Sequence, residues 1–320
     1  MKKNIIFLNL NMILFMCIFL SSCSYDNKSK ANNSIVPTID KSYEIIPSTS
    51  KDKPSIMPTI EINYRNEDIV YEGLIYNIVD EEAICVGYKG SPKDVNIPSY
   101  ILHDEGDEIP VTSIGSYAFY GCITLKSVTF EDVSNLTNIS DLSFAICMNL
   151  TDIEIPNSVT NIGNYAFSRC QKLTTIKIPN SVTSIGSYAF SDCVHLMNIE
   201  IPNSVTSIGE HAFSYCKRLP NIKIPNNVTN FGEYLLAGCE NLKYIEIPNS
   251  VTIIEDHAFF FCDMLESVYY TGTLEEWLNI NIEQSNSYLT SATVYYYSET
   301  IPTLDGNYWY YDNDGNIVIW

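Results

Sequence analysis

The sequence Ile178-Pro-Asn-Ser-Val-Thr-Ser-Ile-Gly-Ser-Tyr-Ala-Phe-Ser-Asp-Cys-Val-His-Leu-Met-Asn-Ile-Glu200 is followed at once by Ile201-Pro-Asn-Ser-Val-Thr-Ser-Ile-Gly209. The period is therefore 23 residues, and its columns extend over seven copies. The cysteine column consists of Cys122, Cys147, Cys170, Cys193, Cys216, Cys239 and Cys262. The phenylalanine column consists of Phe119, Phe144, Phe167, Phe190, Phe213 and Phe259, with Leu236 in the remaining copy. A fixed period of this length predicts repeats that stack into a solenoid, because one copy cannot bury its apolar face alone.

Each part of the repeat predicts a local structure. Leu173 to Ile178 alternates apolar and polar residues, as a half-buried strand does, and Pro179 ends the strand because it has no N–H to donate. Gly186 is expected to allow a tight or left-handed turn. The stretch 187–193 is too short for a long helix and predicts one or two helical turns. The sequence therefore predicts an α/β-type repeat solenoid, with short parallel strands on one wall and short helical turns on the other.

These residues resemble the BspA-like, or treponemal-type, leucine-rich repeat family. The shared pattern is a Leu-x-x-Ile-x-Ile-Pro strand followed by x-x-Val-x-x-Ile-Gly-x-x-Ala-Phe-x-x-Cys, and seven such repeats are predicted over 107–270. One copy departs from the pattern at Phe130 to Leu136, where two extra residues predict a local bulge. The resemblance implies a cell-surface protein that adheres to, or recognises, host extracellular proteins or other microbial surfaces.

The N-terminus predicts export and a lipid anchor. Residues 1–22 have two lysines, an apolar run from Ile5 to Leu20 and small residues, as a signal peptide does. The run ends Leu20-Ser-Ser-Cys23, which resembles a bacterial lipobox, and this resemblance implies cleavage before Cys23 and its acylation. Two or three acyl chains anchor a protein stably where a single chain does not. An ordinary secretion signal with a coincidental cysteine is the alternative.

Composition bounds the rest of the chain. Residues 23–63 are rich in Ser, Lys, Asn and Pro, and such a segment cannot bury enough apolar surface to fold, so it predicts a disordered linker. The formal net charge of the chain is −20. This charge argues against nucleic acid and anionic lipid as partners, since both need clustered Lys and Arg.

Both ends of the array lose the period, which predicts caps over the exposed core. Within 64–106, Leu74 to Tyr88 predicts a β-hairpin around Asp80-Glu81-Glu82, and Val95 to Pro98 resembles a degenerate first strand. The stretch 271–320 predicts an aromatic cap that contains Trp277, Trp309 and Trp320 and ends in a hairpin with an Asp314-Gly315 turn. This last segment resembles a single choline-binding cell-wall repeat, so a carbohydrate or cell-wall site on its aromatics is an open alternative to a purely structural cap.

The cysteines and histidines do not indicate catalysis or metal binding. Zinc sites need converging ligands at short spacings, whereas these cysteines are 23 or 25 residues apart, so we expect them to pack as small apolar residues. His211 and His257 share one column with several tyrosines and are expected on the outer face. The sequence contains no phosphate-binding loop, nucleophile elbow or zinc-protease motif. We therefore predict no enzyme, no catalytic residues, no metal and no cofactor.

The outward positions of the predicted strands form the candidate binding surface. In a parallel stack they line up as ladders of polar side chains with aromatic residues at the C-terminal end. The candidate binding residues are Glu154, Lys177, Glu200, Lys223, Tyr244, Glu246 and Tyr269. Alternating Glu and Lys would also serve only to avoid like-charge stacking. A recognition strip and a merely charge-balanced wall both remain open.

The sequence as a whole predicts a non-catalytic cell-surface protein, anchored to a membrane through its lipid, that binds a protein partner through the solenoid. A carbohydrate or cell-wall-binding module that uses the C-terminal aromatics, or a structural surface spacer, are the alternatives.

Overall fold

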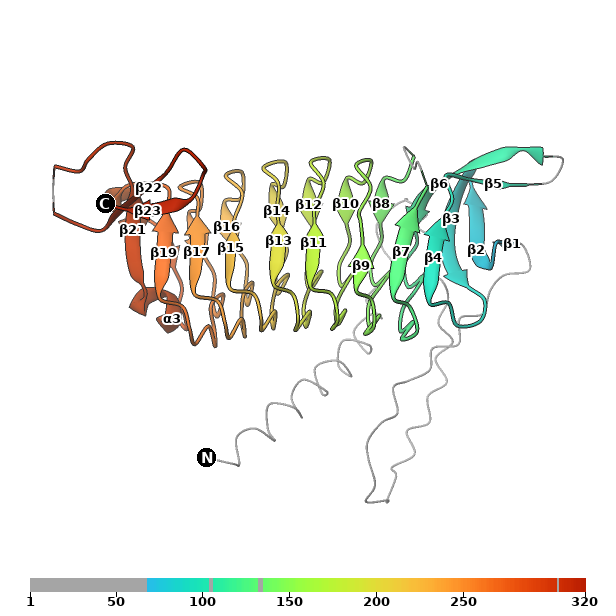
Figure 1. Cartoon of the computed structure of the whole chain (residues 1–320), viewed down its shortest axis with the longest axis horizontal. Coiled ribbons are helices and arrows are strands. Elements are labelled where there is room, and N and C mark those ends of the chain that lie inside the picture. Colours follow the sequence, from blue (N-terminus) through green and yellow to red (C-terminus); the bar gives the residue numbers. More distant parts are fainter. Residues whose placement is uncertain (1–67, 104–105, 132–134, 304) are drawn as a thin grey trace, which may run out of the picture. The chain divides into compact units, whose positions relative to one another are not determined.

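The structure is a computed structural model that describes residues 68–103, 106–131, 135–303 and 305–320 (Figure 1). The chain divides into two units, Met1–Ile62 and Asn63–Trp320, and all described residues belong to the second. The predicted signal peptide, Cys23 and the linker lie outside the described residues, as do residues 132–134 of the predicted bulge. No helix among the described residues is long and apolar enough to cross a membrane.

The predicted strands form one wall of a solenoid, which we call the strand wall. Its members are β7 (Ser127–Phe130), β9 (Asp152–Ile153), β11 (Thr175–Lys177), β13 (Asn198–Glu200), β15 (Asn221–Lys223), β17 (Tyr244–Ile247) and β19 (Ser267–Tyr270). Paired neighbours are parallel and in register with the repeat, so that Lys177 faces Glu200 and Lys223 faces Glu246. One Ile or Val near the middle of each strand is buried, and its two neighbours point outward, as in Thr175-Ile176-Lys177. The fold class predicted from the 23-residue period is confirmed.

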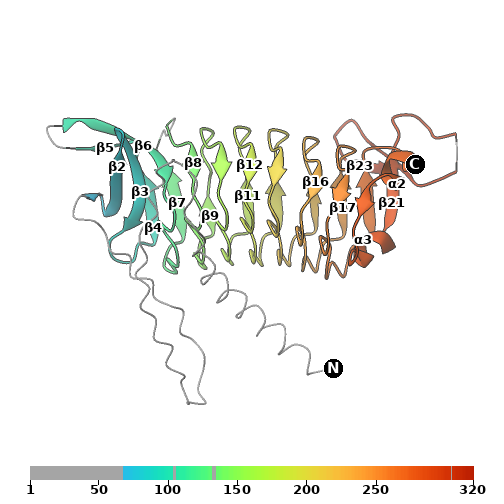
Figure 2. The ribbon, with the colours of Figure 1, turned by 180° about the vertical axis from the view of Figure 1, so that it is seen from behind.

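A second set of strands, each two residues long except β6, forms the opposite wall, which we call the short-strand wall (Figure 2). It consists of β6 (Glu108–Ile114), β8 (Asn138–Ile139), β10 (Asn161–Ile162), β12 (Ser184–Ile185), β14 (Ser207–Ile208), β16 (Asn230–Phe231), β18 (Ile253–Ile254) and β20 (Asn281–Ile282). A threonine precedes each of the strands β8, β10, β12, β14, β16 and β18, and it helps to tie the coils together. Thr183 Oγ1, for example, donates to the carbonyl of Thr160 at 3.3 Å, and the Thr183 amide donates to the same oxygen at 2.9 Å.

The segments expected as helical turns are instead successive tight turns; no α-helix occurs among the described residues of the repeats. Tyr188 and Asp192 have φ of 58° and 60°, in the left-handed region that a right-handed helix excludes. Alternate N–H groups point to the next coil. Phe190 N donates to Ala212 O at 2.8 Å, and Asp192 N donates to Ser214 O at 2.8 Å. The turn segment therefore stacks coil on coil with hydrogen bonds of its own.

The core is a continuous column of stacked phenylalanines. The rings of Phe119, Phe144, Phe167, Phe190 and Phe213 follow one another at centroid distances of 5.1, 5.3, 5.4 and 5.8 Å, with planes within 5°. Each of these side chains is fully buried. Tyr88 of the N-terminal cap stacks on the first ring at 5.6 Å, so the cap extends the column by one aromatic residue.

The cysteine column packs beside the phenylalanines, as predicted for small apolar residues. The eight described cysteines are free and buried. Cys193 Sγ donates to the carbonyl of Phe167, one coil earlier, at 3.2 Å, while Cys170 N donates to the same oxygen at 3.1 Å. Burial raises the pKa of the Cys262 thiol to about 12 and raises that of Cys170 as well. The thiol therefore stays neutral and adds a weak hydrogen bond to a buried carbonyl.

The N-terminal cap is built from β1 (Ile69–Tyr71), β2 (Leu74–Val79), β3 (Glu82–Tyr88), β4 (Asp94–Ile97) and β5 (Tyr100–Leu102). The predicted hairpin is β2 and β3, and its turn residues Asp80 and Glu81 both have positive φ. The predicted degenerate strand is β4, which pairs in parallel with β7 and starts the strand wall. Both local predictions are confirmed.

The C-terminal cap contains α2 (Leu274–Leu278), α3 (Ser287–Ser291), β21 (Thr293–Tyr297), β22 (Tyr308–Tyr311) and β23 (Ile317–Ile319). Thr273 caps α2 through a capping box with Glu276. Strand β21 continues the strand wall from β19. Strands β22 and β23 form the predicted antiparallel hairpin, in which Gly315 has φ of 81°.

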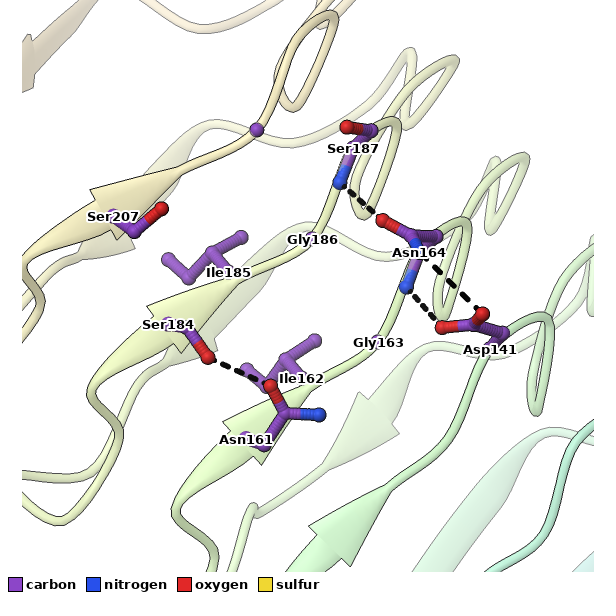
Figure 3. Close-up of a pocket in the computed structure, with 11 residues that line it drawn as sticks. Asp141, Asn161, Ile162, Gly163, Asn164, Ser184, Ile185, Gly186, Ser187 and Ser207 are labelled. Atoms are coloured by element: carbon purple, nitrogen blue, oxygen red, sulfur yellow. Dashed lines mark hydrogen bonds between the residues drawn. The ribbon is translucent and has the colours of Figure 1, made fainter. Parts of the chain in front are cut away.

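Glycine recurs in one column of the repeat, at Gly163, Gly186, Gly209 and Gly232. Gly186 is needed because neighbouring coils approach closely there and not because the turn is left-handed, which corrects the expectation for this residue. A Cβ at Gly186 would lie 2.5 Å from Asn164 N, and one at Gly209 would lie 2.4 Å from Ser187 N (Figure 3). At Gly232 the nearest atom would be Glu210 Cγ at 3.2 Å, which is part of a flexible side chain. The coils therefore meet backbone to backbone along this corner of the array.

We predict that Gly186→Ala lowers the stability of the array by roughly 1–3 kcal/mol, because the coils must separate to admit a methyl group. Gly232→Ala is the matched control and should have a much smaller effect, since the Glu210 side chain can move. Thermal unfolding followed by circular dichroism gives the comparison. Equal melting temperatures for the two variants would contradict the close-approach explanation.

Candidate binding surface

The N-terminal part of the predicted polar strip is open to solvent. Glu154 follows β9, Lys177 lies in β11 and Glu200 lies in β13, and all three side chains are exposed. Lys177 and Glu200 are register partners, so opposite charges lie on adjacent strands. The structure thus brings these predicted residues together on one wall.

The C-terminal part of the strip is covered by the chain itself. The side chain of Glu246 is only 13% exposed, and Tyr244 and Tyr269 are half-buried. Tyr269 packs edge-on against Tyr244, at 5.5 Å between ring centroids, and against Trp309 of β22, at 5.6 Å. Because Trp309 of the C-terminal hairpin packs against Tyr269, and Tyr269 packs against Tyr244, these two tyrosines are not free aromatic anchors.

Tyr311, at the end of β22, fastens this hairpin to the strand wall. Lys223 Nζ donates to the Tyr311 hydroxyl, the Tyr311 hydroxyl donates to Glu246, and Lys223 Nζ lies 2.9 Å from Glu246 Oε2. Lys223 Nζ also lies 4.5 Å from the centre of the Tyr311 ring, within cation–π range. The hairpin is thus fastened by one phenol placed between a cation and a carboxylate.

The protonation states of this triad agree with its hydrogen bonds. Burial opposes the charge of Lys223, but hydrogen bonds to Tyr311 and Glu246 outweigh burial, so the pKa of Lys223 is raised. Burial, followed by the hydrogen bond to Glu246, raises the pKa of Tyr311. At neutral pH the lysine is therefore charged and the phenol keeps its proton.

The predicted aromatic cap is largely used within the fold. Trp309 is fully buried, and its Nε1 donates to the carbonyl of Tyr270 at 2.9 Å. Trp277 packs edge-on against Tyr270 at 5.2 Å between centroids and is half-buried. Trp320 is 43% exposed, but its ring stacks on Tyr310 at 4.3 Å and its Nε1 donates to Ser298 O. Of the three predicted tryptophans, Trp320 offers the most accessible surface.

The short-strand wall carries a shallow polar groove of about 280 Å³ (Figure 3). Gly163, Gly186 and Gly209 line it between two rows of polar side chains. One row continues from coil to coil through backbone caps: Asp141 Oδ1 accepts from Asn164 N at 2.6 Å, and Asn164 Oδ1 accepts from Ser187 N at 2.8 Å. These polar groups form hydrogen bonds with one another. The groove therefore follows from the missing side chains of the glycines and from this row of hydrogen bonds.

A second aromatic column runs along the outer face, where His211 and His257 were expected. Tyr165, Tyr188, His211, Tyr234 and His257 stack at centroid distances of 4.5, 4.2, 4.6 and 4.7 Å, with planes within 9°. Their faces cover one another, so they stabilise the stack and leave mainly ring edges exposed. Burial lowers the pKa of His211 to about 4, so this ring is neutral at pH 7.

The described residues contain no group of three or more His, Cys, Asp or Glu side chains placed to hold a metal ion. Cys23, the predicted lipidation site, lies outside the described residues. The sequence analysis missed Tyr311 as a partner of the strand wall, because it lies 88 residues from Lys223 and outside the repeats.

Comparison with known proteins identifies the repeats. The model of the family described as "BspA type Leucine rich repeat region" matches in six copies over residues 108–200 and 183–307. A leucine-rich repeat protein from Bacteroides ovatus is similar in structure, with a TM-score of 0.56 and 29% identity over 71% of this chain and 55% of that chain. The T. pallidum leucine rich repeat protein gives a TM-score of 0.55 and 30% identity, over 62% of this chain and 90% of that chain. No curated protein matches the sequence.

We predict that Tyr311→Phe loosens the C-terminal hairpin, because it removes the hydroxyl that Lys223 and Glu246 share. A hydrogen bond to a charged group contributes about 1.5–3 kcal/mol, so amides of β22 and β23 should exchange at least about tenfold faster. Tyr310→Phe, which keeps the ring that stacks on Trp320, is the control. Equal hydrogen exchange in the two variants would refute the fastening role of Tyr311.

We predict that the stability of the array decreases as the pH falls from 6.5 towards 4, in part through His211. In the unfolded chain this histidine takes up a proton near its ordinary pKa of 6.5, whereas in the stack it stays neutral until about pH 4. His211→Tyr, which copies its neighbours Tyr188 and Tyr234, should therefore gain stability relative to the native chain below pH 6.5. Urea unfolding at several pH values measures this difference, and a difference independent of pH would disprove the assignment.

Proposed function

Because the chain belongs to the BspA-type leucine-rich repeat family, we propose that it is a non-catalytic cell-surface protein that binds a protein partner through the exposed part of its strand wall. The observation that carries the proposal is the register-paired, exposed Lys177 and Glu200, flanked by exposed Glu154, on the part of the strand wall from β9 to β13. The partner class is a host extracellular protein or another microbial surface, by resemblance to the family.

The geometry of the repeats supports binding of a partner on the strand wall rather than a reaction or a small-molecule site in a pocket. Solenoids present long surfaces in which each coil adds one strand and its side chains. The groove on the short-strand wall is shallow, and its polar groups are engaged with one another. The buried Trp309 and the stacked Trp320 speak against the alternative of a carbohydrate site built from the C-terminal aromatics.

The N-terminal sequence supports placement at the cell surface. Residues 1–22 resemble a lipoprotein signal peptide, Cys23 ends a lipobox-like run, and the stretch up to residue 63 has the composition of a flexible tether. We propose that the acylated Cys23 anchors the protein and that the linker holds the solenoid away from the membrane.

The first test compares two triple variants of the full chain in binding to immobilised extracellular-matrix proteins and to whole bacterial cells. Glu154→Ser, Lys177→Ser and Glu200→Ser together should weaken saturable binding at least about tenfold, as expected when central contact residues are removed. Lys172→Ser, Glu210→Ser and Glu233→Ser change the same charges at exposed positions off the strand wall and should leave binding intact. Similar binding by both variants would move the site off this wall, and no saturable binding by the native chain would leave a structural spacer.

A separate test addresses the anchor. The native chain should incorporate a labelled fatty acid when expressed in a bacterium and should partition with the membrane fraction. Cys23→Ser should abolish both, whereas Cys85→Ser, at a buried position in the N-terminal cap, should not affect labelling. Fatty-acid labelling that persists in Cys23→Ser would exclude the proposed anchor.

A further inference from the structure

The contact between Tyr311 and the strand wall shows which side chain this wall can bind. Three features of the phenol are used at once. The ammonium of Lys223 lies over the ring and donates to the hydroxyl oxygen, and the carboxylate of Glu246 accepts the hydroxyl hydrogen. A phenylalanine would lack the hydroxyl, and a serine or threonine would lack the ring, so the arrangement is complementary to tyrosine.

The same pair of residues occurs once more on the wall. Lys177 and Glu200 precede Lys223 and Glu246 by two periods, and they face each other on β11 and β13 as the later pair does on β15 and β17. The residues beneath are also equivalent, since Ile176 and Ile199 are buried as Ile222 and Ile245 are. The difference is exposure: Lys177 and Glu200 are both open to solvent, whereas Glu246 is covered.

We propose that the Lys177–Glu200 pair is a docking site for a tyrosine side chain on an extended segment of a partner protein, held as Tyr311 is held at the later pair. This inference rests on the proposed function and specifies its partner chemistry. In this column Lys177 lies between Glu154 and Glu200. A phosphate or carboxylate that reached Lys177 would therefore lie close to two carboxylates, whereas a neutral phenol carries no charge for them to repel.

The surroundings of the pair leave room for such a segment. The neighbouring outward residues on the same strands are Thr175 and Asn198, both exposed, short and uncharged. Beside the later pair, the position equivalent to Asn198 is Tyr244, which packs against Tyr269. A partner strand at the earlier pair could therefore lie across β11 and β13 and place its tyrosine between the two charges.

The test uses the chain's own hairpin as the probe. A cyclised peptide with the sequence of residues 306–320 is titrated into the full chain, and the amide NMR signals of Lys177 and Glu200 are followed. We expect a saturable shift of these signals. Affinity should fall at least tenfold when the peptide carries Phe in place of Tyr311, and also when the protein carries Lys177→Ser. Lys172→Ser, at an exposed position off the strand wall, should leave the affinity unchanged.

Three results would overturn the proposal: equal affinity of the Phe peptide, shifts confined to Lys223 and Glu246 because the peptide displaces the native hairpin, or no saturable shift up to ~1 mM peptide. Failure of this inference can be told from failure of the proposed function. Surface binding that is lost in the strand-wall triple variant but kept in Lys177→Ser would leave the function standing without the tyrosine site. If the peptide binds as expected but the native chain binds no surface, the tyrosine site would stand and the proposed function would fail.

Discussion

The structure depends on backbone hydrogen bonding between consecutive coils, which occurs on the strand wall, on the short-strand wall and in the turn segment between them. Each coil is too short to bury its own apolar residues, and it becomes stable only when a neighbour satisfies its N–H and carbonyl groups. The turn segment is the least usual part, since Phe190 and Asp192 donate to the next coil while the intervening residues close tight turns. This arrangement requires left-handed backbone at Tyr188, at Asp192 and at the equivalent two positions of the other coils.

This stacking explains why particular residue types fill each column. Glycine stands where a Cβ would meet the backbone of the preceding coil, as at Gly186. Cysteine stands where a small buried side chain can still donate to a carbonyl of the previous coil, as Cys193 does. Aromatic rings stack at a separation set by the coils, both in the buried phenylalanine column and in the outer column of Tyr and His that contains His211. On the strand wall, where the column carries charge, Glu and Lys alternate from Glu154 to Glu246, so that like charges do not stack on adjacent coils.

The columns of the sequence were sufficient to predict the solenoid, its strand wall and the hairpins of both caps, because each of these is a local or periodic pattern. The short-strand wall was not predicted, since two residues such as Ser184 and Ile185 are too few to show the alternation of apolar and polar residues that marks a strand. The prediction of helical turns was wrong in detail. A tyrosine such as Tyr188 gives no sign in the sequence that its backbone is left-handed. The candidate strip was correctly placed on one wall, but the covering of Glu246 by Tyr311 joins residues 65 apart that share no pattern.

A regular array offers the same outward positions again and again, so its columns alone do not decide where a partner binds. The ends of the array break this equivalence. The C-terminal hairpin occupies the Lys223–Glu246 pair, and Tyr269 packs under Trp309, which removes the last coils from the accessible strip. Beyond Lys243 the sequence contains no lysine or arginine, so no further pair of Lys and Glu can form on the wall towards that end. The exposed Lys177 and Glu200 are therefore the part of the wall where register pairing, charge balance and access to solvent coincide.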